Sequence, residues 1–128
     1  MSKLKFGKVQ LSIMKVLWGK KCATAWEITE AMNRLSRRRV AHSSVQTHLR
    51  ELEKNGAIGH DVDNRTFVFY PLVKQENVVQ HAFQDFVEQI FSGSATGLVS
   101  YIVENKYVSP EELKKIRDML DNAEKDNT

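Results

Sequence analysis

The 128-residue sequence predicts a mainly α-helical protein that contains one small antiparallel β-hairpin. Apolar residues recur at helical spacing over residues 9–55, alternate with polar residues over 57–70, and return to helical spacing beyond residue 74. Three helices followed by a two-stranded hairpin is the order of a winged helix-turn-helix, and three further helices follow it. We therefore expect a winged-helix domain over residues 1–73 and a helical dimerisation domain over residues 74–128.

The first two helices are expected to form the scaffold of the N-terminal domain. The first is predicted over residues 9–18, because its apolar side chains gather on one broad side and Gly-Lys-Lys follows it. The second is predicted over residues 25–35. It begins at a capping box, in which Thr24 and Glu27 each satisfy an N-terminal amide. The predicted inward face of the second helix consists of Ile28, Ala31, Met32 and Leu35.

The third helix, over residues 42–55, has two contrasting faces. Val45, Leu49 and Leu52 form a narrow apolar stripe, and Asn55-Gly56 supplies a left-handed stop. The opposite face suits the major groove of DNA, because Gln can read adenine and Arg can read guanine. An ordinary surface helix is the alternative. That opposite face consists of Ser43, Gln46, Thr47, Arg50 and Lys54, and none of these is acidic.

The hairpin is predicted from two strand-like segments, residues 57–62 and 65–70, which are rich in β-branched and aromatic residues. Asp63-Asn64 lies between them, and both residue types tolerate the positive φ of a tight turn. Pro71 is expected to end the second strand, because it has no amide proton for the ladder. The hairpin is therefore the expected wing.

Helices are predicted over residues 75–91, 95–105 and 110–124, the last of them starting at Ser109-Pro110. A unit of about fifty residues is too small to bury the wide apolar face of residues 75–91 by itself. We expect a second copy of the chain to cover it, and packing against the first domain is the alternative. The residues expected in the dimer interface are Val79, Phe83, Phe86, Val87, Ile90, Leu98, Ile102, Leu113, Ile116 and Leu120.

Charge is segregated along the chain although the net charge is only +3. Residues 1–74 contain 14 Lys and Arg against 6 Asp and Glu, whereas residues 75–128 contain 5 against 10. The basic first part predicts attraction to a polyanion, and the acidic second part argues against direct membrane binding. With a single cysteine, Cys22, and no signal-peptide pattern, we expect a soluble cytoplasmic protein.

Six segments of the sequence resemble the BlaI/MecI/CopY family of bacterial repressors, in the right order and across nearly the whole chain. The resemblance implies a dimer with an N-terminal winged helix and a three-helix dimerisation unit. It also implies binding to an inverted-repeat operator, often in the promoter of an antibiotic-resistance gene, and repression of transcription. The segments that carry it are residues 11–18, 40–49, 54–58, 64–73, 91–94 and 97–100.

The resemblance also bears on how the protein leaves DNA. The β-lactamase-type members are cut in the C-terminal unit after a membrane sensor with a metalloprotease domain is triggered. The matching stretch is Leu98–Ile102, where Ser100 precedes Tyr101 and relatives have asparagine before the aromatic residue. Cleavage between Ser100 and Tyr101 is an open hypothesis, and a Tyr101 that merely flanks the core is the alternative. The copper-responsive members use C-terminal cysteines, which this chain lacks.

Roles in DNA binding are expected for two groups of residues. Ser43, Gln46, Thr47 and Arg50 are candidates for base and nearby phosphate contacts. Lys54 shares their face, and Ser44 lies at the side of the helix, where it either reaches a phosphate or assists the N-terminus.

Cations outside the third helix are the second group. Arg37, Arg38 and Arg39 precede that helix and are expected to contact phosphates, with a solvated turn as the alternative. The resemblance implies that Arg65, in the wing, approaches the backbone or the minor groove, although Asn64 replaces the usual glycine.

Two aromatic residues beside this surface are expected to have other roles. We expect His48 to be partly buried in the packing of the third helix. Trp26 either lies against the sugar-phosphate backbone or fills a gap beside the first helix.

An enzyme is not expected. The histidines show no metal-ligand spacing, and neither a phosphate-binding loop nor a nucleophile motif is present, so no cofactor or metal is predicted. Two rival functions stay open. One is a winged-helix regulator released by a small ligand that binds on the apolar face of residues 75–91. The other is a protein-interaction module, against which the lack of acid on the outer face of the third helix argues.

Overall fold

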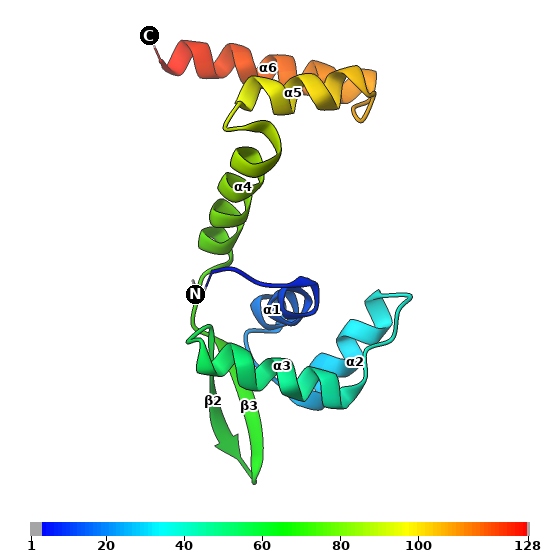
Figure 1. Cartoon of the computed structure of the whole chain (residues 1–128), viewed down its shortest axis with the longest axis vertical. Coiled ribbons are helices and arrows are strands. Elements are labelled where there is room, and N and C mark those ends of the chain that lie inside the picture. The colour runs from blue at the N-terminus through cyan, green and yellow to red at the C-terminus, as the bar shows by residue number, and fades with distance from the viewer. Residues whose placement is uncertain (1–3, 128) are drawn as a thin grey trace. The chain divides into compact units, whose positions relative to one another are not determined.

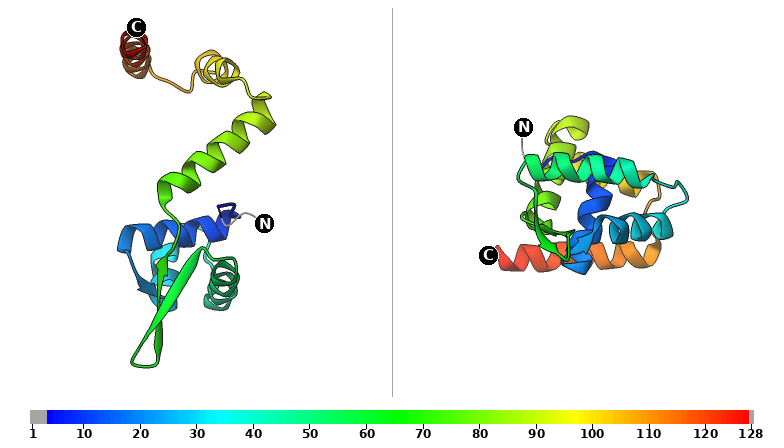
Figure 2. Two further views of the ribbon diagram at one scale, coloured as in Figure 1. Left: turned by 90° about the vertical axis from the view of Figure 1, so that its left-hand side faces the viewer. Right: turned by 90° about the horizontal axis from the view of Figure 1, so that it is seen from below.

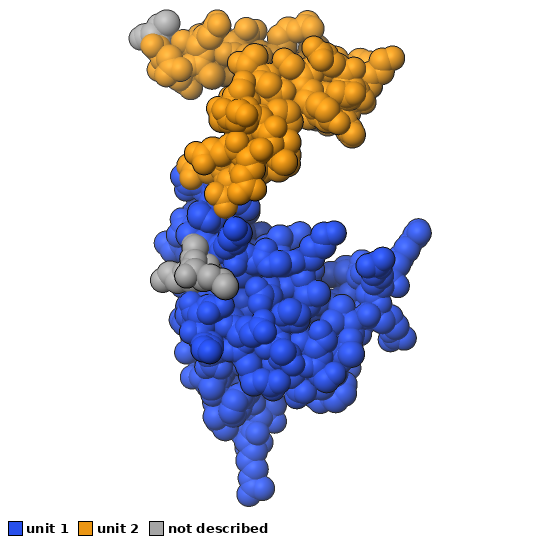
Figure 3. All heavy atoms as spheres, in the orientation of Figure 1, with its two compact units in different colours: residues 1–83 blue, residues 84–128 orange. Residues whose placement is uncertain are grey.

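The computed structural model describes residues 4–127 and confirms the predicted fold class (Figure 1). The chain divides into two compact units, residues 1–83 and 84–128 (Figure 3). The division falls inside a helix, so the functional boundary after residue 73 stays a prediction. The elements are α1 (Lys8–Lys20), β1 (Ala23–Thr24), α2 (Ala25–Leu35), α3 (His42–Lys54), β2 (Ile58–Asp63), β3 (Thr66–Pro71), α4 (Gln75–Phe91), α5 (Ala95–Glu104) and α6 (Pro110–Asp126).

The core of the N-terminal unit lies where α1, α2 and α3 meet the base of the hairpin. The predicted apolar stripe of α3 is entirely buried in this core: it consists of Val45, Leu49 and Leu52. The Trp18 indole nitrogen donates to the backbone oxygen of Val73 (2.9 Å) and thereby ties α1 to the chain beyond β3. The largest side chains with almost no exposure are Ile13, Met14, Leu17, Ile28, Leu49, Leu52, Ile58 and Val45.

The sheet has three antiparallel strands in the order β1-β3-β2, whereas the sequence predicted only the hairpin. The extra strand is the pair Ala23–Thr24, which meets β3 opposite Phe69 and Val68. A two-residue strand leaves no alternating pattern to recognise. The β2–β3 hairpin projects beyond α1, α2 and α3 (Figure 2, left).

The turn of the hairpin lies one residue later than predicted. Asp63 pairs with Thr66, so Asn64 and Arg65 are the two turn residues, with φ of 49° and 68°. Two central residues with positive φ are the mark of a type I′ turn, which matches the right-handed twist of the strands. Arg65 therefore belongs to the turn and not to the second strand.

Both ends of α2 lie where they were predicted, at residues 25 and 35, but the expected burial of one residue is wrong. The capping box is present: the Thr24 amide donates to Glu27 Oε1 (2.9 Å), and the Glu27 amide donates to Thr24 Oγ1 (3.2 Å). Leu35 was expected to face the core, but its side chain is 86% exposed. It ends the last turn of the helix, beyond Met32, which is the last residue of α2 that the core buries.

The second unit contains the end of α4 together with α5 and α6. The latter begins at a capping box between Ser109 and Glu112. Phe91 makes edge contacts with Phe86 and Tyr101, at ring-centroid distances of 5.7 and 6.0 Å. Within residues 95–126, neither α5 nor α6 buries a single side chain. The described part of the chain, residues 4–127, contains no helix long and apolar enough to cross a membrane.

Candidate nucleic-acid interface

The outer face of α3 presents the predicted polar side chains to solvent. Ser43, Gln46, Thr47, Arg50 and Lys54 are all exposed, and Ser44 is half-buried at the side of the helix. Two hydrogen bonds order this face: Thr47 Oγ1 donates to the backbone oxygen of Ser43 (3.1 Å), and Arg50 Nη2 donates to Thr47 Oγ1 (3.2 Å). The Arg50 guanidinium is thus partly positioned, and its remaining N–H groups stay able to donate.

The segment that leads into α3 is held by one side chain of α2. Asn33 Oδ1 accepts from the Val40 amide (2.7 Å), and Asn33 Nδ2 donates to the Val40 backbone oxygen (3.2 Å). A side-chain amide that satisfies both backbone groups of one residue fixes that residue as a strand partner would. Arg37, Arg38 and Arg39 are therefore presented, all exposed, by a loop with a fixed end.

A cleft of about 460 Å³ separates the start of α2, the outer side of α3 and the wing. It brings Gln46 and Arg50 of α3 together with Arg65 of the turn, while Arg37, Arg38 and Arg39 lie outside it. Because these three donors come from two elements, the cleft can receive a ligand rich in acceptors, such as the edge of a DNA groove.

Trp26 and His42 form the wall of this cleft, which the sequence did not reveal. Their rings stack at a centroid distance of 3.6 Å and an angle of 7°. Trp26 is 63% exposed, so of its two predicted roles the one in which it fills a gap beside α1 is wrong. An indole at the second residue of α2 lies near the first turn of α3 only after the two helices pack, and no sequence pattern reports that.

The tautomer of His42 follows from its neighbour. Thr29 Oγ1 donates its one proton to the Ala25 backbone oxygen (2.8 Å) and lies 3.0 Å from His42 Nδ1. A hydroxyl that has used its proton can only accept, so His42 Nδ1 carries a proton and donates it to Thr29. The ring nitrogen that can serve an outside partner is therefore Nε2.

Two glutamates on the flanks of α3 contact other elements. Glu53 contacts His60 Nδ1 of β2 at 2.5 Å, and His60 stacks on Phe67 of β3 at 4.0 Å. On the other flank, Glu51 accepts from Gln10 of α1 (3.1 Å), and the half-buried His48 lies 3.5 Å from it. The two carboxylates join α3 to the wing and to α1, and Glu53 also lines the cleft.

The capping box affects the electrostatics at the start of α2. The Thr24 amide, which donates to the Glu27 carboxylate, holds the pKa of that carboxyl below its ordinary value of 4.5.

Within residues 4–127, no group of three His, Cys, Asp or Glu side chains is arranged to hold a metal ion. The single cysteine, Cys22, is exposed.

The residues predicted for the dimer interface are exposed or half-buried in the single chain, and none is buried. On α4, Val79, Phe83, Phe86 and Ile90 are exposed and Val87 is half-buried. Apolar patches of this kind commonly mark interaction sites. On α5 and α6, Leu98, Ile102, Leu113 and Ile116 are half-buried and Leu120 is exposed.

Comparison with known proteins gives a match along most of the chain. Residues 6–122 match the model of the family described as penicillinase repressor. The chain is 28% identical over 108 residues to the methicillin resistance regulatory protein MecI of Mammaliicoccus sciuri, which covers 84% of this chain and 86% of that relative. It is 25% identical over 112 residues to the penicillinase repressor of Bacillus licheniformis, which covers 88% and 86%.

A solved structure matches the N-terminal part. The DNA-binding domain of the repressor BlaI, known from a solution structure, is similar with a TM-score of 0.51 and 27% sequence identity. The match covers 60% of this chain and 93% of that domain.

Proposed function

Because this chain belongs to the penicillinase repressor family of DNA-binding transcriptional repressors, we propose that it works as a homodimer on an inverted-repeat operator. Each winged helix reads one half-site, and the C-terminal helices join the two copies. The observation that carries the proposal is the cleft in which Gln46, Arg50 and Arg65 converge, and its one acid, Glu53, is engaged by His60. Binding over a promoter excludes the transcription machinery, in the way that suits control of an antibiotic-resistance gene.

Base reading is assigned to α3. Gln46 and Arg50 carry the donors and acceptors that suit adenine and guanine edges in the major groove. Ser43 and Thr47 are the shorter partners beside them, and the Thr47 hydroxyl also positions Arg50 (3.2 Å). Sequence preference therefore depends on a small cluster on one face of one helix.

Phosphate contacts are assigned to the surrounding cations, which hold the protein in register without reading sequence. Arg65 at the turn and Arg37, Arg38 and Arg39 before α3 are exposed on different elements of the N-terminal unit. Lys54 and Ser44 extend the same surface along α3. Trp26, exposed in the cleft and stacked on His42, is assigned to the sugar-phosphate backbone.

Dimerisation is assigned to the helices beyond residue 74, as the predicted division into domains requires. The large apolar side chains of Phe83, Phe86 and Ile90 are exposed to water, although helices of stable proteins bury such faces. A second copy covers them at a two-fold axis, which also places two winged helices on two halves of an inverted repeat.

Release from DNA is proposed to follow a cut between Ser100 and Tyr101 by a membrane sensor protease. Both residues lie within α5, with Ser100 half-buried and Tyr101 49% exposed. A cut here divides α5 and separates Tyr101 from Phe91, its partner at 6.0 Å, so the apolar unit loses its integrity. Incubation with the metalloprotease domain of the sensor tests this step: fragments ending at Ser100 support it, and an intact chain contradicts it.

The DNA-binding proposal is tested by selection of random duplex DNA on the purified full chain, followed by sequencing of the bound pool. We expect enrichment of a spaced inverted repeat. A folded protein that enriches no motif contradicts the proposal, and a single motif without a symmetric partner contradicts the dimer.

A further inference from the structure

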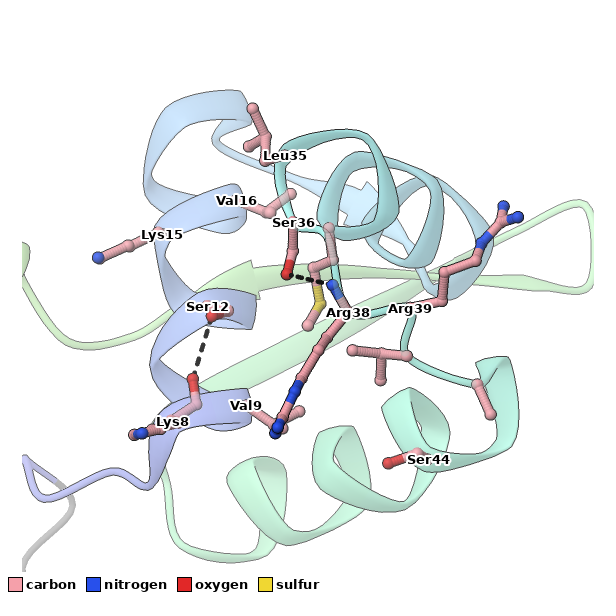
Figure 4. A pocket seen from close by; sticks show the side chains of 13 residues that line it. Lys8, Val9, Ser12, Lys15, Val16, Leu35, Ser36, Arg38, Arg39 and Ser44 are labelled. Carbon is pink, nitrogen blue, oxygen red and sulfur yellow. Dashed lines mark hydrogen bonds between the residues drawn. The ribbon is translucent and has the colours of Figure 1, made fainter.

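A second hollow, a groove of about 800 Å³, lies in the N-terminal unit (Figure 4). Its walls are α1, the last turn of α2, the loop of residues 36–41 and the first turn of α3. The groove and the cleft share only α2 and α3. The wing, which lines the cleft, does not line the groove. We name it the α1–α2 groove.

Apolar side chains form the floor of the α1–α2 groove. Val9 and Val16 come from α1, Met32 from α2, and Val40 from the loop. Leu35, which is exposed and lies outside the core, borders the same groove. A concave apolar surface of this size is typical of a site for a small organic molecule.

Of the cations that line the groove, Arg38 reaches over it, whereas Lys8 and Lys15 point away from it in Figure 4. Lys8, Lys15, Arg38 and Arg39 are among the lining residues, which include no acid. In Figure 4 the Arg38 side chain lies across the groove toward Val9, whereas Arg39 points away from α1. The Arg38 amide donates to Ser36 Oγ (3.2 Å), which fixes the backbone from which this arginine reaches over the apolar floor.

From this combination we propose that the α1–α2 groove binds a small organic anion with an apolar body. Arg38 pairs with the anionic group, and the valines with Met32 receive the body. A DNA phosphate would match the cations but leaves the apolar floor without a partner, and a neutral apolar ligand leaves the cations without one. An amphipathic anion satisfies both parts of the groove.

Binding in the groove opposes DNA binding, a consequence that rests on the proposed function. Arg38, Arg39 and Ser44 line the groove and also belong to the proposed DNA-contacting surface. A cation that pairs with the ligand no longer neutralises a phosphate. The loop that carries the two arginines leads into α3 through Val40, which Asn33 holds at both backbone groups. The ligand therefore acts as an inducer.

Two fluorescent probes with similar apolar bodies test the site without DNA: anilinonaphthalene sulfonate, which is anionic, and phenylnaphthylamine, which is neutral. We expect Arg38→Gln to weaken binding of the sulfonate by about tenfold, as expected for a charge-assisted hydrogen bond, and to leave the amine unchanged. Arg37→Gln is the matched control, because it removes the same charge from the adjacent residue, outside the groove. Equal sulfonate affinities for the two variants, or no binding of the sulfonate, overturn the proposal.

A second control addresses the apolar part of the groove. Leu35→Ser is expected to weaken both probes, whereas Leu72→Ser, at another exposed leucine outside the groove, is expected to weaken neither. Both side chains are largely in water, so neither change removes core packing. Equal effects of the two changes contradict an apolar contact at Leu35.

The coupling to DNA is tested separately by adding the sulfonate to the wild-type protein–DNA complex. We expect DNA affinity to fall in the wild type and in Arg37→Gln, and to respond far less in Arg38→Gln. If the probe binds without any effect on DNA affinity, the coupling to DNA is refuted, whereas the proposed binding site is not. A wild-type protein that binds the probe but no DNA contradicts the proposed function alone.

Discussion

Replacement of Arg50 by Ala is predicted to remove preference for one base pair in each half-site. Arg50 is exposed on α3, and one of its terminal nitrogens donates to Thr47 Oγ1 at 3.2 Å. That bond uses one of five N–H groups, which leaves enough donors for a bidentate interaction with guanine. The held orientation reduces the side-chain entropy that binding costs.

The size of the effect follows from how many guanines Arg50 reads. One bidentate pair contributes about 1–3 kcal/mol of discrimination between base pairs. A homodimer on an inverted repeat uses it twice, so the expected effect is about 2–6 kcal/mol, or between about 30-fold and about 20,000-fold in affinity. Removal of the charge alone acts equally on every sequence and makes the salt dependence shallower.

Fluorescence anisotropy with the selected duplex and with a scrambled duplex separates these two effects. Arg50→Ala is expected to weaken the selected duplex strongly and the scrambled one little. Arg50→Lys keeps the charge but lacks the planar fork, so it is expected to remove most of the preference as well. Arg37→Ala, a change at a proposed phosphate contact, is expected to weaken both duplexes alike. An Arg50→Ala protein whose affinity falls equally for both duplexes refutes the assignment of Arg50 to a base.

Four further predictions concern the wing, the dimer and the start of α2. Arg65→Gln should make the slope of log affinity against log salt shallower by about 0.9 for each phosphate that Arg65 neutralises, and an unchanged slope contradicts that role. Phe86→Asp should yield monomers in sedimentation, because Phe86 is 46% exposed on the proposed interface; Gln84→Asp, which adds the same charge on another side of α4, should remain dimeric. Thr24→Ala should cost about 1 kcal/mol in the free energy of unfolding. The lowered pKa of Glu27 stabilises the fold above its ordinary value of 4.5, and that stability is lost as pH falls through the lowered pKa. Glu27→Gln should therefore flatten the acid limb of the stability curve, and an unaltered limb contradicts this role.

The helices and their caps could be predicted from the sequence because they depend on local order. The Thr24–Glu27 capping box needs only residues three apart, and α2 begins where that pair requires. The resemblance of short segments to the repressor family was equally local, and the family match over residues 6–122 confirms it. The burial of Val45, Leu49 and Leu52 follows from their spacing on α3.

The incorrect predictions all depend on contacts between elements. Strand β1 has two residues and exists only because β3 pairs with it. Leu35 continues the apolar spacing of α2 but lies beyond the last turn that the core buries. The hairpin turn shifts to Asn64–Arg65 because the pairing of Asp63 with Thr66 fixes the register, and register is a property of two strands.

The residues of the candidate site on α3 and in the wing were predicted, but their convergence in one cleft was not. The cleft that joins Gln46, Arg50 and Arg65 requires the wing to fold beside α3. The stack of Trp26 on His42 likewise joins two helices whose packing no short pattern describes. The roles of these residues in DNA binding stay predictions, and the experiments above address them.

The central claim is that two copies of the chain read the two halves of a symmetric site. It is tested most directly by comparing the selected inverted repeat with a duplex in which one half-site is reversed to make a direct repeat. Composition and spacing are unchanged, and only the two-fold symmetry is removed. We predict two chains bound to the inverted repeat in native mass spectrometry, and affinity for the direct repeat that falls to that of a single half-site. Equal affinity for the two duplexes contradicts the account.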